Sequence, residues 1–222
     1  MNEILRVEDV HRSYGTQEVL KGVSISITAG EFVGIMGPSG SGKTTLLHIM
    51  GGILSPDSGT VNYNGKQVNP APLNLRAAYR REVGFVFQNF NILNELTVLE
   101  NLLLSMMVAR LPCDREEAMK QLRYVGMEHK ADAYPDELSM GELQRVAIAR
   151  CMVRNPSIVF ADEPTGSLDT ANKELVMEIF RDIHKHGKTL VVVSHDSNTL
   201  KGATRIIELV DGRIFNGGPL RR

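Results

Sequence analysis

Residues 37–44 read Gly37-Pro-Ser-Gly-Ser-Gly-Lys43-Thr44 and fill every fixed position of the phosphate-binding pattern G-x-x-x-x-G-K-[ST]. The apolar run 32–36 precedes this loop, and the helix-like stretch 45–50 follows it. Glycines let successive backbone N–H groups turn toward a polyphosphate without Cβ clashes, and a helix N-terminus behind them adds partial positive charge. The order of strand, loop and helix therefore predicts a nucleoside-triphosphate site.

Two side chains of this loop have distinct expected roles. Lys43 is expected to reach the β- and γ-phosphates, and the Thr44 hydroxyl is expected to ligate Mg²⁺. The residues of this segment that are expected to bind the nucleotide are Gly37, Pro38, Ser39, Gly40, Ser41, Gly42, Lys43, Thr44 and Thr45. The predicted cofactors are therefore ATP and Mg²⁺.

A second candidate group lies at residues 158–163, where the apolar run Ile-Val-Phe-Ala ends in Asp162 and Glu163. Asp162, at the carboxyl end of a buried strand, is placed to hold Mg²⁺ directly or through water. Glu163 can polarise the attacking water as a general base. An Asp-Glu pair is also a common strand terminus, but its position downstream of a phosphate loop favours the catalytic interpretation.

The third motif is Leu138-Ser-Met-Gly-Glu142, followed by Leu143-Gln-Arg-Val-Ala-Ile-Ala-Arg150. Ser139 and Gly141 open a helix whose free N–H groups could bind an anion. The alternative is a plain amphipathic helix, because serine is a good N-cap residue in any case. With the phosphate loop, this motif resembles the ATP-binding cassette (ABC) ATPases, whose signature is Leu-Ser-Gly-Gly-Gln before Gln-Arg-Val-Ala-Ile-Ala-Arg.

The resemblance implies that Ser139, Gly141 and Glu142 contact the γ-phosphate bound by the opposite subunit of a head-to-tail homodimer. Glu142 in place of glutamine is a familiar variation in the family. Met140 departs from the pattern, because the family usually has a glycine at this position. Its side chain is expected either to crowd the facing nucleotide or to be tolerated, and activity is expected to be retained.

Four further positions match the family. The resemblance implies that Tyr14 stacks on adenine and that Gln88, after the strand at 83–87, senses Mg²⁺. It also implies that His195 contacts the γ-phosphate and that the loop ending in Asp169 lies against the dimer partner. The expected catalytic residues are Glu163, His195, Lys43 and Gln88, and the expected metal ligands are Thr44, Gln88 and Asp162.

Periodicity predicts β structure at both ends of the chain. In the first 30 residues, Val23, Ile25 and Ile27 alternate with polar residues, as in a half-buried strand. Residues 60–65 indicate a short strand that ends in a turn. The segment 206–214 indicates a hairpin with an Asp-Gly turn at residues 211–212.

The middle of the chain changes character. Helical stretches are expected at 99–110, 115–125 and 141–153, with no convincing strand between residues 96 and 154. Near-continuous apolar runs at 157–161 and 189–193 are typical of parallel strands covered on both faces. Between those runs, a helix is expected with a buried face formed by Leu175, Ile179, Phe180 and Ile183 and a stop at Gly187.

These elements predict an α/β fold with a RecA-like P-loop nucleotide-binding core, an N-terminal antiparallel β lobe and an inserted α-helical lobe. Residues 1–222 are expected to form one ABC nucleotide-binding domain. Its core and β lobe are expected at about 1–90 and 155–222, and its helical lobe at about 91–154.

The composition argues against several function classes. Charged residues nearly balance, with 25 Lys and Arg against 26 Asp and Glu, so no nucleic-acid partner is expected. The two cysteines, Cys113 and Cys151, suit a reduced compartment. No signal peptide is expected, and the apolar stretch 102–109 is far shorter than the roughly 20 residues of a membrane span. The chain is expected to be cytoplasmic, with any membrane role supplied by a partner.

Within the family, residues 87–93, 96–101, 161–169 and 194–196 look like the lipoprotein-releasing and macrolide-exporter (LolD and MacB) types. Polar amino-acid importers share the Phe-Gln-x-Phe-Asn stretch, but they usually carry Ser-Ala-Leu-Asp where this chain has Gly166-Ser-Leu-Asp169. Soluble ABC ATPases usually have two cassettes or a long coiled coil, and this chain has neither.

The resemblance implies an ATP-hydrolysing subunit of an ABC transporter that dimerises on ATP and drives a separate integral-membrane permease in efflux, extraction or mechanotransmission. A periplasmic or extracytoplasmic adaptor is a further expected partner. The chain is then peripheral on the inner face of the cell membrane. The open alternatives are a cell-division or cofactor-assembly ATPase without solute transport, and a polar amino-acid importer.

Overall fold

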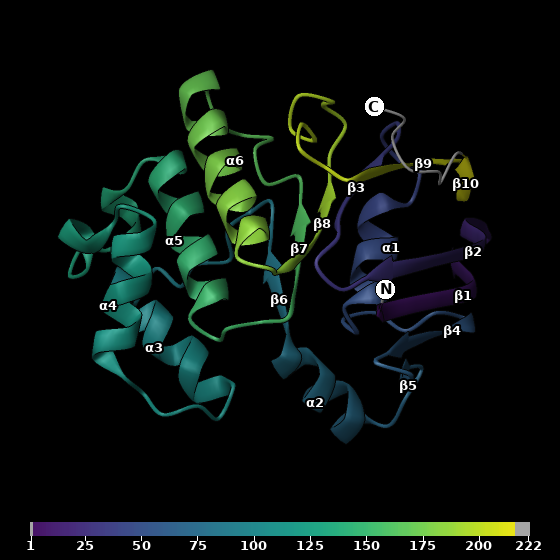
Figure 1. Ribbon diagram of the computed structural model, residues 1–222, viewed down its shortest axis with the longest axis horizontal. Helices are drawn as coiled ribbons and strands as arrows, with labels where there is room; N and C mark the ends of the chain where they lie inside the picture. The colour runs from purple at the N-terminus through teal and green to yellow at the C-terminus, as the bar shows by residue number, and fades with distance from the viewer. Residues whose placement is uncertain (1, 216–222) are drawn as a thin grey trace.

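The computed structural model describes residues 2–215, which form two β-sheets and six α-helices (Figure 1). The first sheet is antiparallel, with the strand order β2-β1-β4-β5. Its strands are β1 (Glu3–Tyr14), β2 (Gln17–Thr28), β4 (Ser58–Tyr63) and β5 (Lys66–Asn69). Val23, Ile25 and Ile27 of β2 are buried while their neighbours are exposed or partly exposed, so the predicted half-buried strand is confirmed.

The second sheet has six strands in the order β10-β9-β3-β8-β7-β6. They are β3 (Phe32–Met36), β6 (Val83–Val86), β7 (Ile158–Asp162), β8 (Thr189–Val193), β9 (Arg205–Val210) and β10 (Arg213–Phe215). All neighbouring pairs except β9–β10 are parallel. Every residue of β7 and β8 is buried, because helices and the other sheet cover both faces, which explains their near-continuous apolar sequences.

The helices divide between the two sides of this sheet. They are α1 (Lys43–Met50), α2 (Leu73–Glu82), α3 (Val98–Val108), α4 (Arg115–Tyr124), α5 (Met140–Met152) and α6 (Thr170–Lys185). Two short 3₁₀ turns lie at Glu128–Lys130 and Pro135–Glu137. One hydrophobic core joins α1, the antiparallel sheet and one face of the parallel sheet. The other joins the opposite face to α3–α6 (Figure 1).

Side-chain caps fix where several helices begin. Thr97 and Glu100 form a capping box at the start of α3, and Ser139 and Glu142 form another at the start of α5. Asp114 caps α4 by accepting hydrogen bonds from two backbone N–H groups of its first turn. These local signals explain why the helices expected at 99–110, 115–125 and 141–153 are all present.

The C-terminal hairpin also forms as the sequence predicts. Residues 211 and 212 make a two-residue turn between β9 and β10, with φ values of +46° and +73°. Positive φ at both turn positions gives the connection the twist that antiparallel strands need, and Asp-Gly supplies it at low cost. Gly187, with φ +85°, follows α6 and confirms the predicted helix stop.

The structure departs from the sequence analysis in two places. Leu175 is 46% exposed, so it does not belong to the buried face of α6, which is formed by Val176, Met177, Phe180 and Ile183. The first turns of α6 are exposed on the side of Leu175, and the buried face begins one residue later, at Val176. Helix α2 was not expected, because its apolar residues Leu73 and Leu75 show no helical spacing and are themselves exposed.

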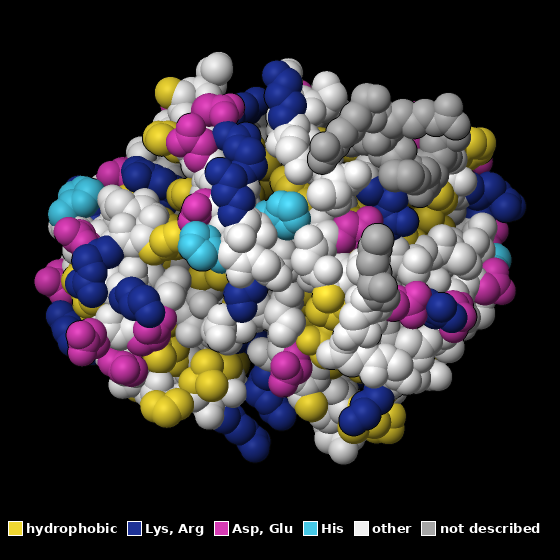
Figure 2. Space-filling model, viewed as in Figure 1, with side chains coloured by type: hydrophobic (Ala, Val, Ile, Leu, Met, Phe, Trp, Pro, Cys, Tyr) yellow, Lys and Arg dark blue, Asp and Glu magenta, His cyan; other side chains and the backbone are white. Residues whose placement is uncertain are grey.

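The observed topology confirms the predicted α/β fold with an antiparallel β lobe and a helical insertion. Residues 96–154 contain helices and 3₁₀ turns and no strand. The exact division at residues 90 and 155 stays a prediction. Positive and negative side chains are interspersed over the face in Figure 2, in agreement with the near-zero net charge. Within residues 2–215, no helix combines the length and apolar character needed to span a membrane.

Candidate functional site

The phosphate loop connects β3 to α1, and two of its glycines are required by close backbone contacts. A Cβ on Gly37 would lie 2.0 Å from the carbonyl oxygen of Leu209 in β9. Gly42 has φ +99°, and a Cβ there would lie 2.9 Å from the carbonyl oxygen of Val19. Any larger residue would therefore push the loop away from the strands that hold it. These contacts hold the loop close to one strand of each sheet.

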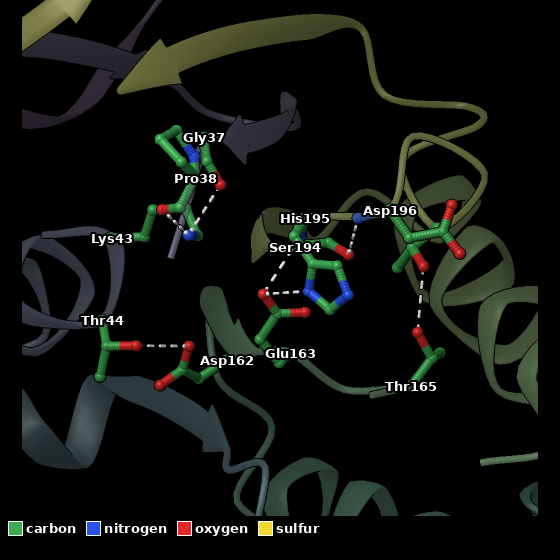
Figure 3. A network of polar contacts seen from close by, with 11 residues as sticks. Gly37, Pro38, Lys43, Thr44, Asp162, Glu163, Thr165, Ser194, His195 and Asp196 are labelled. Atoms are coloured by element: carbon green, nitrogen blue, oxygen red, sulfur yellow. Dashed lines mark hydrogen bonds and ion pairs between the residues drawn. The ribbon is translucent and has the colours of Figure 1, made fainter. Parts of the chain in front are cut away.

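Lys43 folds back across this loop. Its Nζ donates hydrogen bonds to the carbonyl oxygens of Gly37 at 2.9 Å and Pro38 at 2.8 Å (Figure 3). The side chain is buried, and it has no carboxylate partner among the ion pairs of residues 2–215. A buried ammonium held only by neutral carbonyls has unsatisfied charge, which a phosphate group would compensate.

The Thr44 hydroxyl donates a hydrogen bond of 3.0 Å to Oδ1 of Asp162, at the carboxyl end of β7 (Figure 3). Asp162 is buried, and burial raises the pKa of its carboxyl group although the bond from Thr44 opposes this effect. No ion pair of the described residues includes Asp162. A divalent cation would relieve this buried charge, so the donor set fits Mg²⁺.

The protein supplies few ligands for such an ion. No group of three or more His, Cys, Asp or Glu side chains converges within residues 2–215. Mg²⁺ is commonly held by one or two protein oxygens together with nucleotide phosphates and water. Thr44 and Asp162 therefore suit a metal that arrives with a nucleotide, rather than a permanent protein metal centre.

Glu163 follows β7 with φ +43°, a left-handed conformation that is unusual for a residue with a side chain. Its Oε1 accepts a hydrogen bond from the backbone N–H of His195 at 3.1 Å and lies 2.9 Å from Nδ1 of the same residue (Figure 3). His195 follows β8, the strand beside β7. The two predicted catalytic side chains are thus in direct contact at the carboxyl edge of the sheet, where ligands bind in such folds.

These groups face one cavity of about 490 Å³. It is lined by Tyr14, Gln17, Val19, Ser39, Gly40, Gly42, Lys43, Thr44, Thr45, Gln88, Glu163 and His195. Three further predicted residues do not line the cavity but are bonded to residues that do. Gly37 and Pro38 accept hydrogen bonds from Lys43, and Asp162 accepts one from Thr44. Ser41 is buried in the loop. The cavity brings together the predicted residues of the phosphate loop, Tyr14, Gln88, Glu163 and His195.

Tyr14 lies at the open side of this cavity, with 51% of its surface exposed. The guanidinium of Arg12 lies 5.2 Å from its ring centroid, so one face of the ring already has a cationic neighbour. Gln17 and Val19 were not expected in the site. The short turn after Tyr14 could have indicated them. It predicts a hairpin, and in that hairpin Gln17 pairs with Tyr14 and is carried to the same cavity.

The remaining predicted residues lie outside the cavity, at the N-termini of α5 and α6. Ser139 caps α5, and Glu142 accepts hydrogen bonds of 2.8 Å from both the backbone N–H and the hydroxyl of Ser139. The backbone bond from Ser139 is the main reason why the pKa of Glu142 is lowered. Asp169 caps α6. Ser139, Gly141, Glu142 and Asp169 therefore form a second group that does not touch the cavity of its own chain.

Arg150 connects α5 to the segment that carries Gln88. Its guanidinium donates hydrogen bonds to the carbonyl oxygens of Phe90, at 2.7 Å, and of Asn91. Phe90 and Asn91 have φ values of +57° and +53°, so Arg150 holds a turn of unusual backbone conformation. The helical region is thereby linked to Gln88 at the cavity wall.

The fold and the cavity together define a nucleotide-binding protein of the P-loop class. Residues 20–166 match the family model described as ABC transporter. The chain therefore belongs to the ABC transporter family, and its enzyme class is that of an ATPase.

Relatives agree with the predicted subgroup. The chain is 46% identical to the macrolide export ATP-binding/permease protein MacB of Chlorobium phaeobacteroides, over 97% of this chain and 34% of that protein. It is 43% identical to the lipoprotein-releasing system ATP-binding protein LolD of Bacteroides fragilis, over 96% of this chain and 100% of LolD. The chain thus spans about a third of the MacB relatives and the full length of this LolD. The predicted resemblance to these two types is confirmed.

Solved structures show the same fold. The dimeric structure of MJ0796, a bacterial ABC transporter cassette, superimposes with a TM-score of 0.91 at 38% identity, covering 99% of this chain and 100% of MJ0796. A second dimeric structure of MJ0796, with the same TM-score, identity and coverage, is a post-hydrolysis state bound to ADP and Pi.

Proposed function

We propose that this chain is the ATPase subunit of a membrane transporter and that two copies enclose two ATP molecules between them. The observation that carries this proposal is the separation of two donor groups on one chain. Lys43 and the phosphate loop line the cavity, whereas Ser139 and Gly141 at the α5 N-terminus do not line it. A self-complementary two-fold pairing brings the second group of one copy to the open cavity of the other.

In this dimer, ATP is bound by the phosphate loop of one subunit and by Ser139 and Gly141 of the other. Lys43 exchanges its bonds to Gly37 and Pro38 for the β- and γ-phosphates. Glu163 accepts a proton from the attacking water as the γ-phosphoryl group departs. Thr44, Asp162 and Gln88 would hold a Mg²⁺ ion, which would neutralise phosphate charge when bound.

His195 positions Glu163 through the contact between Nδ1 and Oε1 and reaches the γ-phosphate with its other ring nitrogen. Tyr14 presents its free face to the adenine ring. Closure depends on the triphosphate, because only ATP offers a γ-phosphate to the donors of both subunits. Hydrolysis removes that link and reopens the dimer, and this cycle does work on the attached membrane protein.

The permease contact is a groove of about 230 Å³ beside α3 and α5. It is lined by Phe85, Phe87, Leu93, Asn101, Leu104, Ser105, Val108, Arg150, Cys151 and Arg154. Gln88, Asn89 and Phe90 do not line this groove. Arg150 forms part of its wall and holds the turn after Gln88, so a permease helix seated here is linked to the cavity.

Efflux or extraction is the proposed direction of work, supported by the similarity to LolD and MacB. The chain then lies on the cytoplasmic face of the membrane, attached through its permease, with an extracytoplasmic adaptor as a further partner. Isolation of the protein from native membranes, with identification of the copurifying integral protein, tests this assignment. A permease with a large extracytoplasmic domain supports it, and a cell-division protein or a polar amino-acid permease overturns it.

Val108→Asp tests the permease groove. Val108 is 72% exposed at the end of α3 and does not touch the ATP cavity. The added charge is expected to release the protein from its permease, because burial of a carboxylate is costly where Val108 lies beside the apolar side chains of Leu93 and Leu104. Basal ATPase of the isolated chain is expected to stay within about twofold of the parent, because surface substitutions away from a site have small effects.

Leu175→Asp is the matched control, because Leu175 is an exposed apolar residue on α6 outside the groove. Cosedimentation with permease-containing membranes and ATPase assays give the two readouts. Equal membrane recovery of the Val108 and Leu175 variants would show that the groove is not the permease contact.

Met140→Gly tests the departure in the signature motif. Met140 is 49% exposed in the first turn of α5, with its side chain outside the hydrophobic core. We expect the ATPase rate to stay within about threefold, because an exposed flexible thioether can move away from a partner. ATP-dependent dimerisation and steady-state turnover are the measurements. A strong gain in dimerisation would mean that Met140 crowds the facing nucleotide, and a severe loss of activity would mean that its side chain makes a required contact.

A further inference from the structure

Asn172, in the first turn of α6, lies directly against Gly141 at the start of α5. A Cβ built on Gly141 would lie 2.2 Å from Oδ1 and 2.4 Å from Cγ of Asn172. Such distances are impossible for a real side chain, so the amide of Asn172 occupies the space that any other residue at position 141 would need. Gly141 is buried by this contact within its own chain.

The same amide is bonded to the cap of α6. Nδ2 of Asn172 donates a hydrogen bond of 2.7 Å to Oδ2 of Asp169, and the backbone N–H of Asn172 donates one of 2.9 Å to Oδ1. Both oxygens of Asp169 are thus held by one residue. These bonds lower the pKa of the Asp169 carboxyl group, the backbone bond most strongly.

On the other side, the turn that contains Gly141 is internally fixed. The capping box of Ser139 and Glu142 closes around it, with bonds of 2.8 Å from the backbone N–H and the hydroxyl of Ser139 to Glu142. Asn172 therefore lies between two hydrogen-bonded segments, the signature turn 138–142 and the loop 167–169. It touches the first by packing and the second by hydrogen bonds.

We infer that Asn172 is a positioning residue that sets the distance between the signature turn and Asp169, so that both segments meet the partner subunit as one unit. This inference rests on the proposed ATP-bound dimer. In that dimer, Gly141 approaches the nucleotide of the partner and Asp169 lies beside it. A fixed spacing between them makes both contacts with the partner form together.

The contact with Asn172 is also a second reason why position 141 requires glycine. Glycine at this position permits close approach to the partner's phosphate, but an alanine would first collide with Asn172 inside its own subunit. The effects of Gly141→Ala and Asn172→Ala on stability should then be coupled, because residues in contact give non-additive free energies. Two residues acting separately would give additive effects.

The first experiment is this double-mutant cycle, measured as thermal unfolding of the nucleotide-free chain. Gly141→Ala is expected to lower the melting temperature clearly, and Asn172→Ala alone only slightly. In the double variant, Oδ1 and Cγ of Asn172 are gone and only its Cβ remains, 3.0 Å from the new methyl group. The double variant is therefore expected to recover a large part of the loss, and additive losses would overturn the contact as the cause.

The second experiment measures the ATP concentration for half-maximal dimerisation in the Glu163→Gln background by light scattering. Asn172→Asp keeps the shape against Gly141 but loses the donor to Asp169 and adds a like charge. It is expected to raise that concentration about threefold or more, because a hydrogen bond to the exposed carboxylate of Asp169 is lost and a like charge is added. Binding of ATP to the single chain is expected to be unchanged, because Asn172 does not line the cavity.

Glu178→Ala, an exposed change on the same helix, is the control and should behave as the parent. The two hypotheses fail in different ways. A parent that never dimerises with ATP overturns the proposed function and the inference with it. A parent that dimerises while Asn172→Asp dimerises equally well overturns the inference about Asn172 alone.

Discussion

Replacing Glu163 by glutamine is expected to lower steady-state ATP hydrolysis by more than about 100-fold, the usual contribution of a general base. The amide keeps the size of the carboxylate and an oxygen that can accept the bond from the backbone N–H of His195, now 3.1 Å long. It cannot take a proton from water. The contacts of Lys43, Thr44 and Asp162 are untouched, so ATP binding should persist.

Because hydrolysis is the step that reopens the proposed dimer, the Glu163→Gln variant should accumulate as an ATP-bound dimer. Phosphate release and size-exclusion chromatography with ATP measure the two effects. Glu178→Gln, which makes the same chemical change on the exposed side of α6, should retain parental turnover. Turnover of Glu163→Gln within about threefold of the parent would remove Glu163 from the role of base.

Much of the fold was predictable because local signals and burial agree. The strands β7 and β8 were recognised from near-continuous apolar runs, and both prove to be fully buried. The hairpin of β9 and β10 was recognised from its Asp-Gly turn, whose positive φ values only a few residue types adopt readily. The strands were thus recognised from burial, and the hairpin from its local turn conformation.

Helix α2 had no such signal. Its buried residue is Tyr79, whose hydroxyl donates to the carbonyl oxygen of Met50 at 2.7 Å, while Leu73 and Leu75 face outward. Its arginine-rich sequence carries no apolar stripe that would predict a packed helix. The prediction for Leu175 was wrong for the opposite reason. Its apolar character suggested burial, but its position on α6 places it at the surface. Tertiary contacts determine both the presence of α2 and the exposure of Leu175.

The residues of the candidate site were also predicted only in part. Sequence motifs located the phosphate loop, Asp162 and Glu163, and the family resemblance added His195. These residues come together because parallel strands bring their carboxyl ends to one edge of the sheet. The sequence did not reveal that Glu163 and His195 are hydrogen-bonded, since their contact depends on the left-handed conformation of Glu163. Nor did it indicate Asn172, whose role arises from the approach of two helix N-termini that are distant in sequence.

Lys43→Ala is expected to fail at an earlier step than Glu163→Gln, because it removes a cation from the phosphate loop itself. Charge-assisted hydrogen bonds are roughly twice as strong as neutral ones, so the affinity for ATP should fall by about 10- to 100-fold. Lys43 is buried against the carbonyl oxygens of Gly37 and Pro38, which lose their donor in the variant. The loop should therefore also become less ordered in the absence of nucleotide.

A change in binding must be separated from a change in folding. Titration with a slowly hydrolysed ATP analogue measures affinity, and thermal unfolding without nucleotide measures stability. Lys185→Ala, at an exposed position near the end of α6, controls for the loss of one positive charge. Lys43→Arg adds a further test. The planar guanidinium group of arginine is larger than the lysine ammonium, so this variant should not recover full ATP affinity in a buried site.

The two variants together discriminate between roles at one cavity. Glu163→Gln should bind ATP and stay closed, whereas Lys43→Ala should remain open and monomeric because no triphosphate is held between the subunits. A Lys43→Ala protein that binds ATP as tightly as the parent would place the phosphates elsewhere. The bonds from Lys43 to Gly37 and Pro38 would then be structural, and a second cation would have to be sought along the cavity wall.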